Sequence, residues 1–342
     1  MLGKKKSTKQ VAAGVDIGAY SIKILETAAE KETNKLTKFA IKEIPPGTTS
    51  DKLPGALKDA LESAGLSTKN IRISLAGPDA IVRIINMPEM SLQDLKSSLK
   101  FEADRYIPFS VDEVNIDCCI LGKAKEGTNQ IRVLLAAVKK DLINRRIKMF
   151  QDIGYAVSLV DVNVFAVLNA FMKSEKDIKP DSSIAILNIG HRYTNIVTCK
   201  GDSPYFTRDI PIGGEHIAGI VARKTSIEPK DVFIGGPAVQ EKQPEIQEAF
   251  RLALAKLGDE IRMSFGYYEN QFGSAVEKVY ISGGLANVEH VPAFLEEVLG
   301  MKPVIWNPIG AFEIGDGVDK AMLESSKSWL AIVAGLVLRT DI

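Results

Sequence analysis

The hydrophobic positions of this chain alternate between short β-branched runs and longer segments with helical periodicity. Residues 71–76 and 80–87 fit strands on either side of a Gly-Pro-Asp turn, and residues 184–189 and 279–282 fit buried strands. Apolar residues recur every three or four positions over 245–272, which predicts one long amphipathic helix. Strands that alternate with helices are typical of α/β proteins. The pattern therefore predicts an α/β fold.

Helix boundary signals support the same interpretation. Ser91 and Asp94 form a capping-box-like pair, and they predict a helix that continues towards Pro108. A second helix is expected in the apolar segment 329–338. This segment is about half the length that spans a bilayer, so it is expected to be a core helix.

The composition excludes several classes of protein. Because 45% of the 342 residues are hydrophobic, the chain has enough apolar material for two domain-sized cores. Lys and Arg total 43, and Asp and Glu also total 43, so no overall basic field exists to hold nucleic acid. The three cysteines and three histidines show no disulfide or metal-binding spacing. We therefore expect a soluble, cytoplasmic protein without a nucleic-acid partner.

A polar, proline-containing segment divides the chain near its middle. The run KSEKDIKPD at 173–181 precedes a new strand, so we expect a first half at 11–180 and a second half at 181–342. A basic tail at 1–10 precedes both halves. This tail either frays into solvent or touches an anionic membrane surface.

Two short segments, half the chain apart, repeat one pattern. The sequence VDIGAYSIKIL at 15–25 and the sequence LNIGHRYTNIV at 187–197 each place an apolar residue, a polar residue and Ile-Gly before a short loop. The polar residue is Asp16 in the first copy and Asn188 in the second. We name the two segments the first turn, residues 16–23, and the second turn, residues 188–195.

These turns have the groups that hold a polyphosphate. Glycine lets the backbone approach phosphate oxygens, free N–H groups bind them, and a carboxylate holds a hydrated Mg²⁺ that bridges them. Asp16 is the candidate for Mg²⁺, through water. A third segment, residues 282–286, follows a strand and lets the backbone approach a nucleoside, and we name it the Gly-Gly loop. The candidate nucleotide-binding residues are Asp16, Gly18, Ala19, Tyr20, Ser21, Lys23, Asn188, Gly190, His191, Thr194, Gly283, Gly284 and Leu285.

These three segments resemble the motifs of a known superfamily. They are similar to the phosphate-1, phosphate-2 and adenosine motifs of the actin, Hsp70 and sugar-kinase superfamily, and residues 160–171 and 330–339 resemble its two connecting helices. Within that superfamily the chain resembles the type IV pilus assembly PilM family over about residues 11–339. The segments that carry this resemblance are 87–117, with YIPF at 106–109 as its most specific part, 209–218 and 260–271.

The resemblance implies a particular fold and ligand. The expected fold is bilobal and actin-like, a duplicated ribonuclease-H-like α/β fold of the FtsA type. The first lobe would span 11–180, with a subdomain inserted at about 88–160, and the second lobe would span 181–342. The resemblance implies that ATP and Mg²⁺ bind between the lobes, with Gly214 and Glu260 as further contacts to the nucleotide.

The resemblance also implies partners and a location. Members of the family dock the N-terminal cytoplasmic peptide of the inner-membrane protein PilN. We therefore expect a cytoplasmic protein that associates with the inner membrane through its partners. Contacts with pilus motor ATPases or a platform protein, and a homo-oligomer, are further expectations.

The second turn departs from the family pattern, which has Asp at the place of Asn188. An amide can bind a phosphate or a metal-bound water, but it brings no negative charge to hold Mg²⁺. Hydrolysis should therefore suffer more than binding, and we expect a slow ATPase at most.

The roles of five residues stay open. Asp161 either positions an attacking water, as in superfamily hydrolases, or caps a helix. His191 either faces a phosphate or is an exposed turn residue. Glu260 either contacts the nucleoside or belongs to the solvated flank of its helix. Tyr106 and Phe109 either line the peptide groove or anchor the inserted subdomain.

The expected function is an ATP-binding adaptor of type IV pilus assembly. One alternative is a phosphotransferase of the sugar or acid kinase type, although the sequence has no signature of an acceptor pocket with its base. Another is a GspL-like component of type II secretion, in which the chain would continue into a membrane span. A polymerising cytoskeletal protein is a third.

Overall fold

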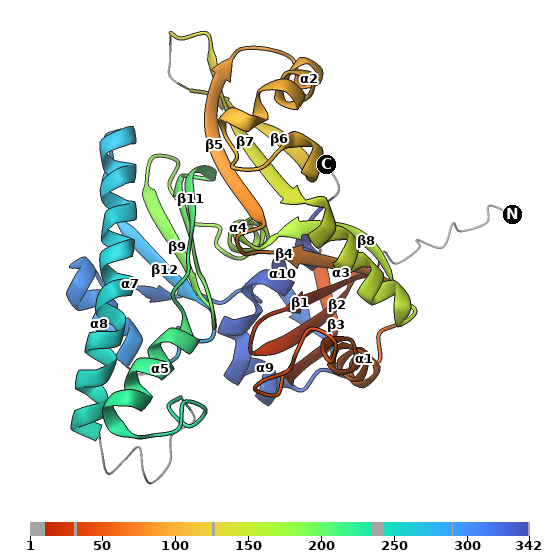
Figure 1. The fold of residues 1–342 in the computed structure, drawn as a ribbon, viewed down its shortest axis with the longest axis vertical. Helices are drawn as coiled ribbons and strands as arrows, with labels where there is room; N and C mark the ends of the chain where they lie inside the picture. The colour runs from red at the N-terminus through yellow and green to blue at the C-terminus, as the bar shows by residue number, and fades with distance from the viewer. Residues whose placement is uncertain (1–10, 31–32, 125–126, 234–242, 289, 341–342) are drawn as a thin grey trace, which may run out of the picture.

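The computed structural model describes residues 11–30, 33–124, 127–233, 243–288 and 290–340. These residues form two lobes, each built on one mixed sheet, and a smaller third sheet lies at one end (Figure 1). The α/β fold class predicted from the sequence is confirmed. The tail expected at 1–10 lies outside the described residues.

The first lobe is built on a six-stranded sheet in the order β14-β3-β2-β1-β4-β8. β1, β2 and β3 form an antiparallel meander, whereas β4 lies parallel to β1 and β8 lies parallel to β4. The strands are β1 (Val11–Ile17), β2 (Ser21–Glu30), β3 (Thr33–Glu43), β4 (Asn70–Leu75), β8 (Ala156–Val162) and β14 (Phe312–Ile314).

The second lobe repeats this arrangement in a five-stranded sheet in the order β11-β10-β9-β12-β13. β9, β10 and β11 form an antiparallel meander, and β12 lies parallel to β9 as β4 does to β1. The strands are β9 (Ser183–Ile189), β10 (Thr194–Lys200), β11 (Ser203–Ile210), β12 (Lys278–Ser282) and β13 (Val304–Ile305). The duplication predicted from the two turns is therefore a duplication of sheet topology.

The two hairpins that contain the turns have the same register. Asp16 pairs with Lys23 one position before the end of the β1–β2 ladder. Asn188 pairs with Asn195 one position before the end of the β9–β10 ladder. Asp16 and Asn188 therefore occupy equivalent places at the carboxyl ends of equivalent strands.

Two helices form a buried layer between the two sheets. α4 (Asn163–Ser174) follows β8, and α10 (Ala331–Leu338) follows the short 3₁₀ helix η3 (Lys327–Leu330), so the helix expected at 329–338 has a 3₁₀ first turn. One core cluster joins both helices to apolar residues of both sheets. The helices cross so closely that a Cβ on Gly335 would lie 1.7 Å from the backbone oxygen of Ala166. Only glycine fits at this crossing.

Further helices cover the outer faces of the two sheets (Figure 1). Apolar residues of α1 and α3 pack on β1, β2 and β4, and α5, α7 and α8 pack on the second sheet. The long helix predicted at 245–272 is α7, and α9 precedes η3. These helices are α1 (Leu53–Ala64), α3 (Lys140–Asp152), α5 (Gly214–Thr225), α7 (Gln243–Phe272), α8 (His290–Leu299) and α9 (Lys320–Ser326).

A third, antiparallel sheet in the order β5-β7-β6 is inserted between β4 and α3. Its elements are β5 (Ala80–Pro88), α2 (Leu92–Glu102), β6 (Val114–Lys123) and β7 (Gln130–Lys139). The predicted capping pair is present, because the amide of Asp94 donates to the Ser91 side chain. β8 pairs with the first sheet, although it begins inside the bounds expected for the insertion. We therefore propose 80–139 as the inserted subdomain in place of 88–160.

One buried arginine connects the inserted sheet to the second lobe. Arg132 of β7 is 5% exposed, and its Nη2 donates to Ser203 Oγ over 2.9 Å. Its guanidinium also lies 3.7 Å from the ring centre of Tyr205. Ser203 and Tyr205 belong to β11, the edge strand of the second sheet. The inserted subdomain therefore bridges the two lobes.

One helical segment among the described residues has the length and composition of a membrane span. It is Lys320–Leu338, with a mean hydropathy of 1.4 in its most apolar window. That window is 67% buried inside the protein, and it includes α10, which forms part of the layer between the sheets.

Candidate functional site

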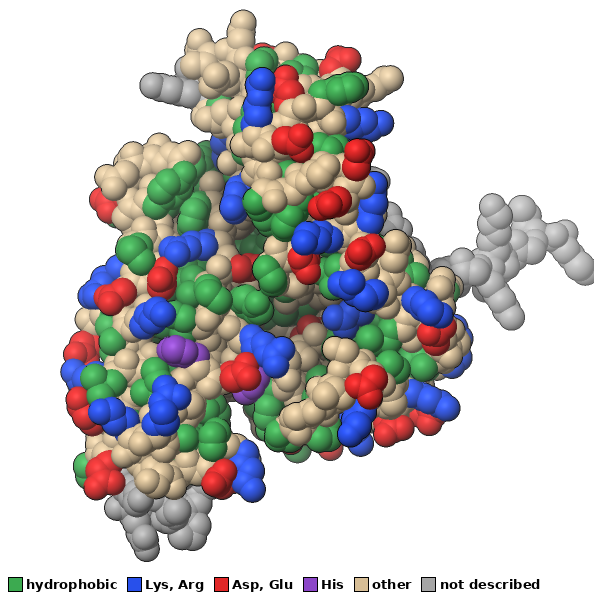
Figure 2. All heavy atoms as spheres, in the orientation of Figure 1, with side chains coloured by type: hydrophobic (Ala, Val, Ile, Leu, Met, Phe, Trp, Pro, Cys, Tyr) green, Lys and Arg blue, Asp and Glu red, His purple; other side chains and the backbone are tan. Residues whose placement is uncertain are grey.

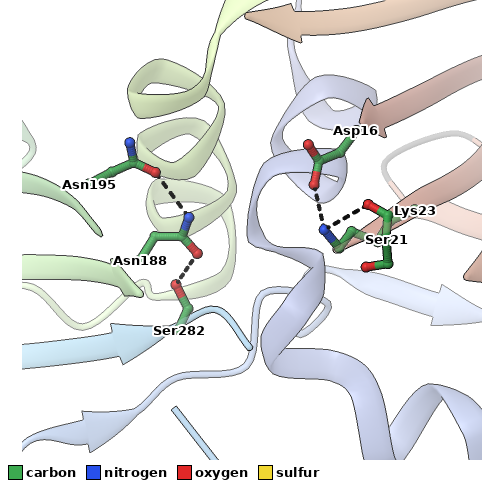
Figure 3. A network of polar contacts seen from close by, with 6 residues as sticks. All are labelled: Asp16, Ser21, Lys23, Asn188, Asn195 and Ser282. Carbon is green, nitrogen blue, oxygen red and sulfur yellow. Dashed lines mark hydrogen bonds and ion pairs between the residues drawn. The ribbon is translucent and has the colours of Figure 1, made fainter. Parts of the chain in front are cut away.

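The first turn holds its polar side chains at the carboxyl end of β1. The carboxylate of Asp16, which is 3% exposed, accepts a hydrogen bond from Lys23 Nζ over 3.1 Å (Figure 3). Lys23 also donates to the backbone oxygen of Ser21 over 3.3 Å. Gly18 N–H donates to the same oxygen over 3.0 Å and closes the turn. A carboxylate, an ammonium group and a glycine therefore meet at one place, whereas the N–H of Gly18, expected to be free for a phosphate, already has an acceptor within the turn.

The second turn replaces the carboxylate with an amide whose two polar atoms are both bonded. Asn188 Nδ2 donates to Asn195 Oδ1 over 3.0 Å, and Ser282 Oγ donates to Asn188 Oδ1 over 3.2 Å (Figure 3). Asn195 Nδ2 in turn donates to Asp209 Oδ1 over 2.7 Å. Burial raises the pKa of Asp209, and the hydrogen bond from Asn195 opposes this rise. We name these four side chains, Ser282, Asn188, Asn195 and Asp209, the amide relay.

The start of α5 lies against the second turn. Gly214 N–H donates to the backbone oxygen of Gly190 over 3.0 Å, and Glu215 N–H donates to that of His191 over 2.8 Å. A Cβ on Gly213 would lie 2.5 Å from the oxygen of Gly190, so the close contact requires a glycine. The carbonyl groups of the turn thus take up the first N–H groups of this helix. A direct contact of Gly214 with the nucleotide stays a prediction.

The Gly-Gly loop packs on the end of β9. Gly283 has a φ of +92°, and a Cβ there would lie 2.4 Å from the oxygen of Ile189. Its N–H donates to the backbone oxygen of Ser328 over 2.7 Å, while Leu285 N–H donates to Ile189 O over 3.3 Å. A Cβ on Gly284 would meet no atom within 4 Å. The loop is therefore fixed at Gly283 and open at Gly284, which suits a close ligand.

Aromatic rings connect the first turn to the second lobe. The ring of Tyr20 lies 5.4 Å from that of His191 and 6.4 Å from that of Trp329, measured between centres. Tyr20 donates its hydroxyl hydrogen to Glu43 over 2.9 Å, and burial together with this carboxylate raises the pKa of Tyr20 to about 12. Burial lowers the pKa of His191, and the negative charge of Glu215 opposes this shift; a contact of His191 with a phosphate stays a prediction.

Asp161 is turned to the end of α10. Its Oδ2 lies 2.6 Å from Arg339 Nη1, and its Oδ1 accepts from Val162 N–H over 2.8 Å. Burial raises the pKa of Asp161, and Arg339 opposes the rise. The alternative in which Asp161 caps a helix is wrong, because the residue that precedes α4 is Val162 and no side chain caps this helix. Positioning of a water by Asp161 stays a prediction.

Three other predicted contacts have local partners. Glu260 pairs with Arg208 of β11, with 2.5 Å between Oε2 and Nη2, and its contact with a nucleoside stays a prediction. Tyr106 and Phe109 pack against the core of the inserted sheet, and Lys139 Nζ lies 4.8 Å from the ring centre of Phe109. These contacts support the anchoring role of both aromatic residues.

The residues present fit a nucleotide with Mg²⁺. Gly18, Gly190 and Gly283 lie in close backbone approaches, and Lys23 supplies a cation at the first turn. Among the described residues, no three or more His, Cys, Asp or Glu side chains gather in a metal site. A Mg²⁺ ion at Asp16 would therefore take its remaining ligands from phosphate and water, which is usual for this ion.

Sequence reasoning missed several partners in this site. Asp209 and Trp329 lie in segments that the sequence singled out, but neither was assigned to the site, because each meets it only through the pairing of β10 with β11 or through the path of η3. The register of the β9–β10 hairpin could have suggested Asn195 as the partner of Asn188. The space-filling view shows a hollow between the two lobes (Figure 2).

The duplicated sheets, the crossed helices and the two facing turns define a protein of the actin-like ATPase fold, which is a nucleotide-binding fold. Two solved structures share the fold alone. The ethanolamine utilization protein EutJ from Carboxydothermus hydrogenoformans is 13% identical, with 96% of this chain and 89% of that chain covered and a TM-score of 0.55. A diol dehydratase-reactivating factor in nucleotide-free form is 11% identical, with 96% and 99% covered and a TM-score of 0.55.

The chain belongs to the family of the type IV pilus assembly protein PilM, whose sequence profile matches residues 14–341. A structure described as a PilM-PilN type IV pilus biogenesis complex is 25% identical to this chain. The alignment covers 96% of this chain and 98% of that one, with a TM-score of 0.83. The family predicted from the sequence is therefore confirmed.

Proposed function

We propose that this protein is an ATP-binding adaptor of type IV pilus assembly that hydrolyses ATP slowly or not at all. Its partner would be the N-terminal cytoplasmic peptide of a PilN-type inner-membrane protein. The protein would lie in the cytoplasm and associate with the inner membrane through that partner. Contacts with pilus motor ATPases, with a platform protein or with further copies of the chain stay predictions.

The contrast between the two turns carries the part of the proposal that concerns the nucleotide. Asp16 and Lys23 offer a carboxylate and a cation at the first turn. At the equivalent place of the second turn, Asn188 is neutral, and both of its polar side-chain atoms form hydrogen bonds within the amide relay. A nucleotide held by one charged turn and one neutral turn would be bound without the second carboxylate that helps to place Mg²⁺ for hydrolysis.

The likeness to the PilM-PilN complex supports the part that concerns the partner. This likeness extends over 96% of this chain and 98% of that one, which supports a partner of the same kind for this chain. A phosphotransferase is less well supported. Asp161, the one acid proposed for water activation, is already paired with Arg339.

The first experiment measures MgATP binding by calorimetry and phosphate release in parallel. We expect the natural chain to bind ATP with almost no phosphate release, and Asp16→Ala to lose binding. Asp59→Ala, which alters an exposed residue of α1, is the matched control. Brisk phosphate release by the natural chain would refute the proposal that the neutral second turn makes ATP hydrolysis slow.

The second experiment measures binding of a synthetic PilN-type N-terminal peptide with and without ATP. A one-to-one complex is the expected result. If the peptide does not bind under either condition, while ATP binds normally, the partner assignment fails and the nucleotide assignment stands.

A further inference from the structure

α3 carries the chain from the inserted sheet back into the first lobe (Figure 1). It begins directly after β7, whose last residue, Lys139, is held by Asp79 across the entry to the insertion with 3.0 Å between Nζ and Oδ1. Leu142, in the first half of α3, packs against the core between the two sheets, whereas Phe150, in the second half, belongs to the outer core of the first sheet. The helix therefore contacts both core clusters beside β8, the edge strand of the first sheet.

Arg146 lies on α3 one helical turn from both Leu142 and Phe150. Its side chain is half-buried, and its Nη1 is fully buried without a hydrogen-bond partner among the residues that the structure describes. Phe150, one turn further along α3, shares a core cluster with Val15 of β1, and Asp16 follows Val15 directly at the carboxyl end of that strand. Burial lowers the pKa of Arg146, and Asp16 opposes this shift.

Asp16 already has a cationic partner. Lys23 forms an ion pair with this carboxylate, and Arg146 brings a further positive charge whose buried Nη1 has no acceptor among the described residues. A buried guanidinium donor without an acceptor is destabilising, and such a group calls for an explanation. An anion that enters beside Asp16 would both neutralise the excess charge and accept from Nη1. Arginine suits a phosphate in particular, because its planar group donates two parallel hydrogen bonds.

We propose that Arg146 binds a phosphate group of the nucleotide at the first turn. This inference rests on the proposed ATP binding, which it extends by a residue outside all three sequence motifs. The phosphate would then contact Lys23 from β2 and Arg146 from α3. Because α3 starts where the inserted sheet ends, the nucleotide would contact the segment that supports this subdomain.

The test uses three variants of the full chain. Arg146→Met removes the charge and keeps the length of the side chain, and Arg146→Lys keeps a charge without the planar fork. Arg145→Met is the matched control, because Arg145 is the exposed neighbour on the same helix. Calorimetry gives the Kd of MgATP and of MgADP at two salt concentrations, and thermal unfolding without nucleotide gives the stability of each variant.

We expect Arg146→Met to weaken MgATP binding about tenfold or more, which corresponds to about 1.4 kcal/mol. The salt dependence of its binding should also decrease, Arg146→Lys should lie in between, and Arg145→Met should bind as the natural chain does. Without nucleotide, Arg146→Met should unfold at the same temperature as the natural chain or higher, since it removes a buried donor that has no acceptor. A loss for MgATP alone would place the contact at the terminal phosphate, and a loss for both nucleotides would place it at an inner phosphate.

Two results would overturn the assignment of Arg146. One is an Arg146→Met variant that binds MgATP as tightly as Arg145→Met does. The other is a variant that binds MgATP normally once folded but unfolds several degrees lower without nucleotide, which would make Arg146 a structural partner of Asp16. If the natural chain binds no MgATP at all, the proposed function itself fails, and the assignment fails with it.

Discussion

Replacing Asn188 by Asp would test the direction of the hydrogen bonds in the amide relay. In the natural chain each donor finds an acceptor, from Ser282 through Asn188 and Asn195 to the carboxylate of Asp209. An ionised Asp at 188 could still accept from Ser282, but it could not donate to Asn195. Two oxygens would then face each other about 3.0 Å apart, which is the present distance from Asn188 Nδ2 to Asn195 Oδ1.

The size of the effect follows from the two ways in which the protein can respond. Protonation of the new carboxyl restores the donor and costs about 4 kcal/mol at pH 7, given a reference pKa of about 3.9 and about 1.36 kcal/mol per pH unit. Rotation of the Asn195 amide restores the first bond but gives up its bond to Asp209, which costs about 1.5–3 kcal/mol because the acceptor is charged. We therefore expect Asn188→Asp to lower the free energy of unfolding by about 2–4 kcal/mol at pH 7.

The pH dependence gives the refuting result. Burial and the need for a donor raise the pKa of the new carboxyl in the folded state. Between the pKa of the unfolded chain and this raised pKa, the folded protein therefore binds more protons than the unfolded chain. The stability of Asn188→Asp relative to the natural chain should therefore decrease as the pH rises from 4 to 7. Urea unfolding at several pH values measures this, with Asn188→Leu as a control whose deficit does not titrate. A variant as stable as the natural chain at pH 7 would refute the relay.

Three further substitutions test the packing and the junctions between parts. Gly335→Ala puts a Cβ 1.7 Å from a backbone oxygen of α4, and we expect a loss of about 3 kcal/mol or more in thermal or urea unfolding, whereas a loss below about 1 kcal/mol would contradict the close crossing. Arg132→Met removes the bond to Ser203 and the stacking on Tyr205, so hydrogen exchange should increase in β5 and β11 and remain unchanged in β1; equal protection in the variant would show that Arg132 does not hold the junction. Gly283→Ala forces a side chain into a backbone with a φ of +92°. We expect the loss in the free energy of MgATP binding to exceed the loss in the free energy of unfolding. Unchanged binding would place the nucleoside elsewhere.

Much of the fold could be predicted because its signals are local and repeated. The two Ile-Gly turns marked equivalent hairpins, and the long apolar stripe marked α7 to within two residues of its start. The bounds of the inserted subdomain could not be predicted in the same way. β4 and β5 are both apolar strands on either side of a tight turn, yet they belong to different sheets, and nothing in their composition distinguishes them.

The candidate site was predictable where one segment supplies both the chemistry and the geometry. Asp16, Lys23 and Asn188 lie where their hairpins predict, because strand register is set by neighbouring residues. Asp161 and Glu260 have partners, Arg339 and Arg208, that are far from them in the sequence. Pairs of this kind depend on tertiary packing, so periodicity and spacing carry no information about them.

α10 is held at both ends and at its midpoint, and this limits how the protein can move. Just before the helix begins, the carbonyl group of Ser328 in η3 accepts from Gly283 of the Gly-Gly loop. At its far end, Arg72 of β4 donates to the last carbonyl groups, and Arg339 holds Asp161 of β8. Gly335, near the middle, touches the backbone of α4. The helix therefore links the Gly-Gly loop of the second lobe to β4 and β8 of the first lobe through direct contacts, so a ligand bound at that loop would be coupled to the first sheet through α10.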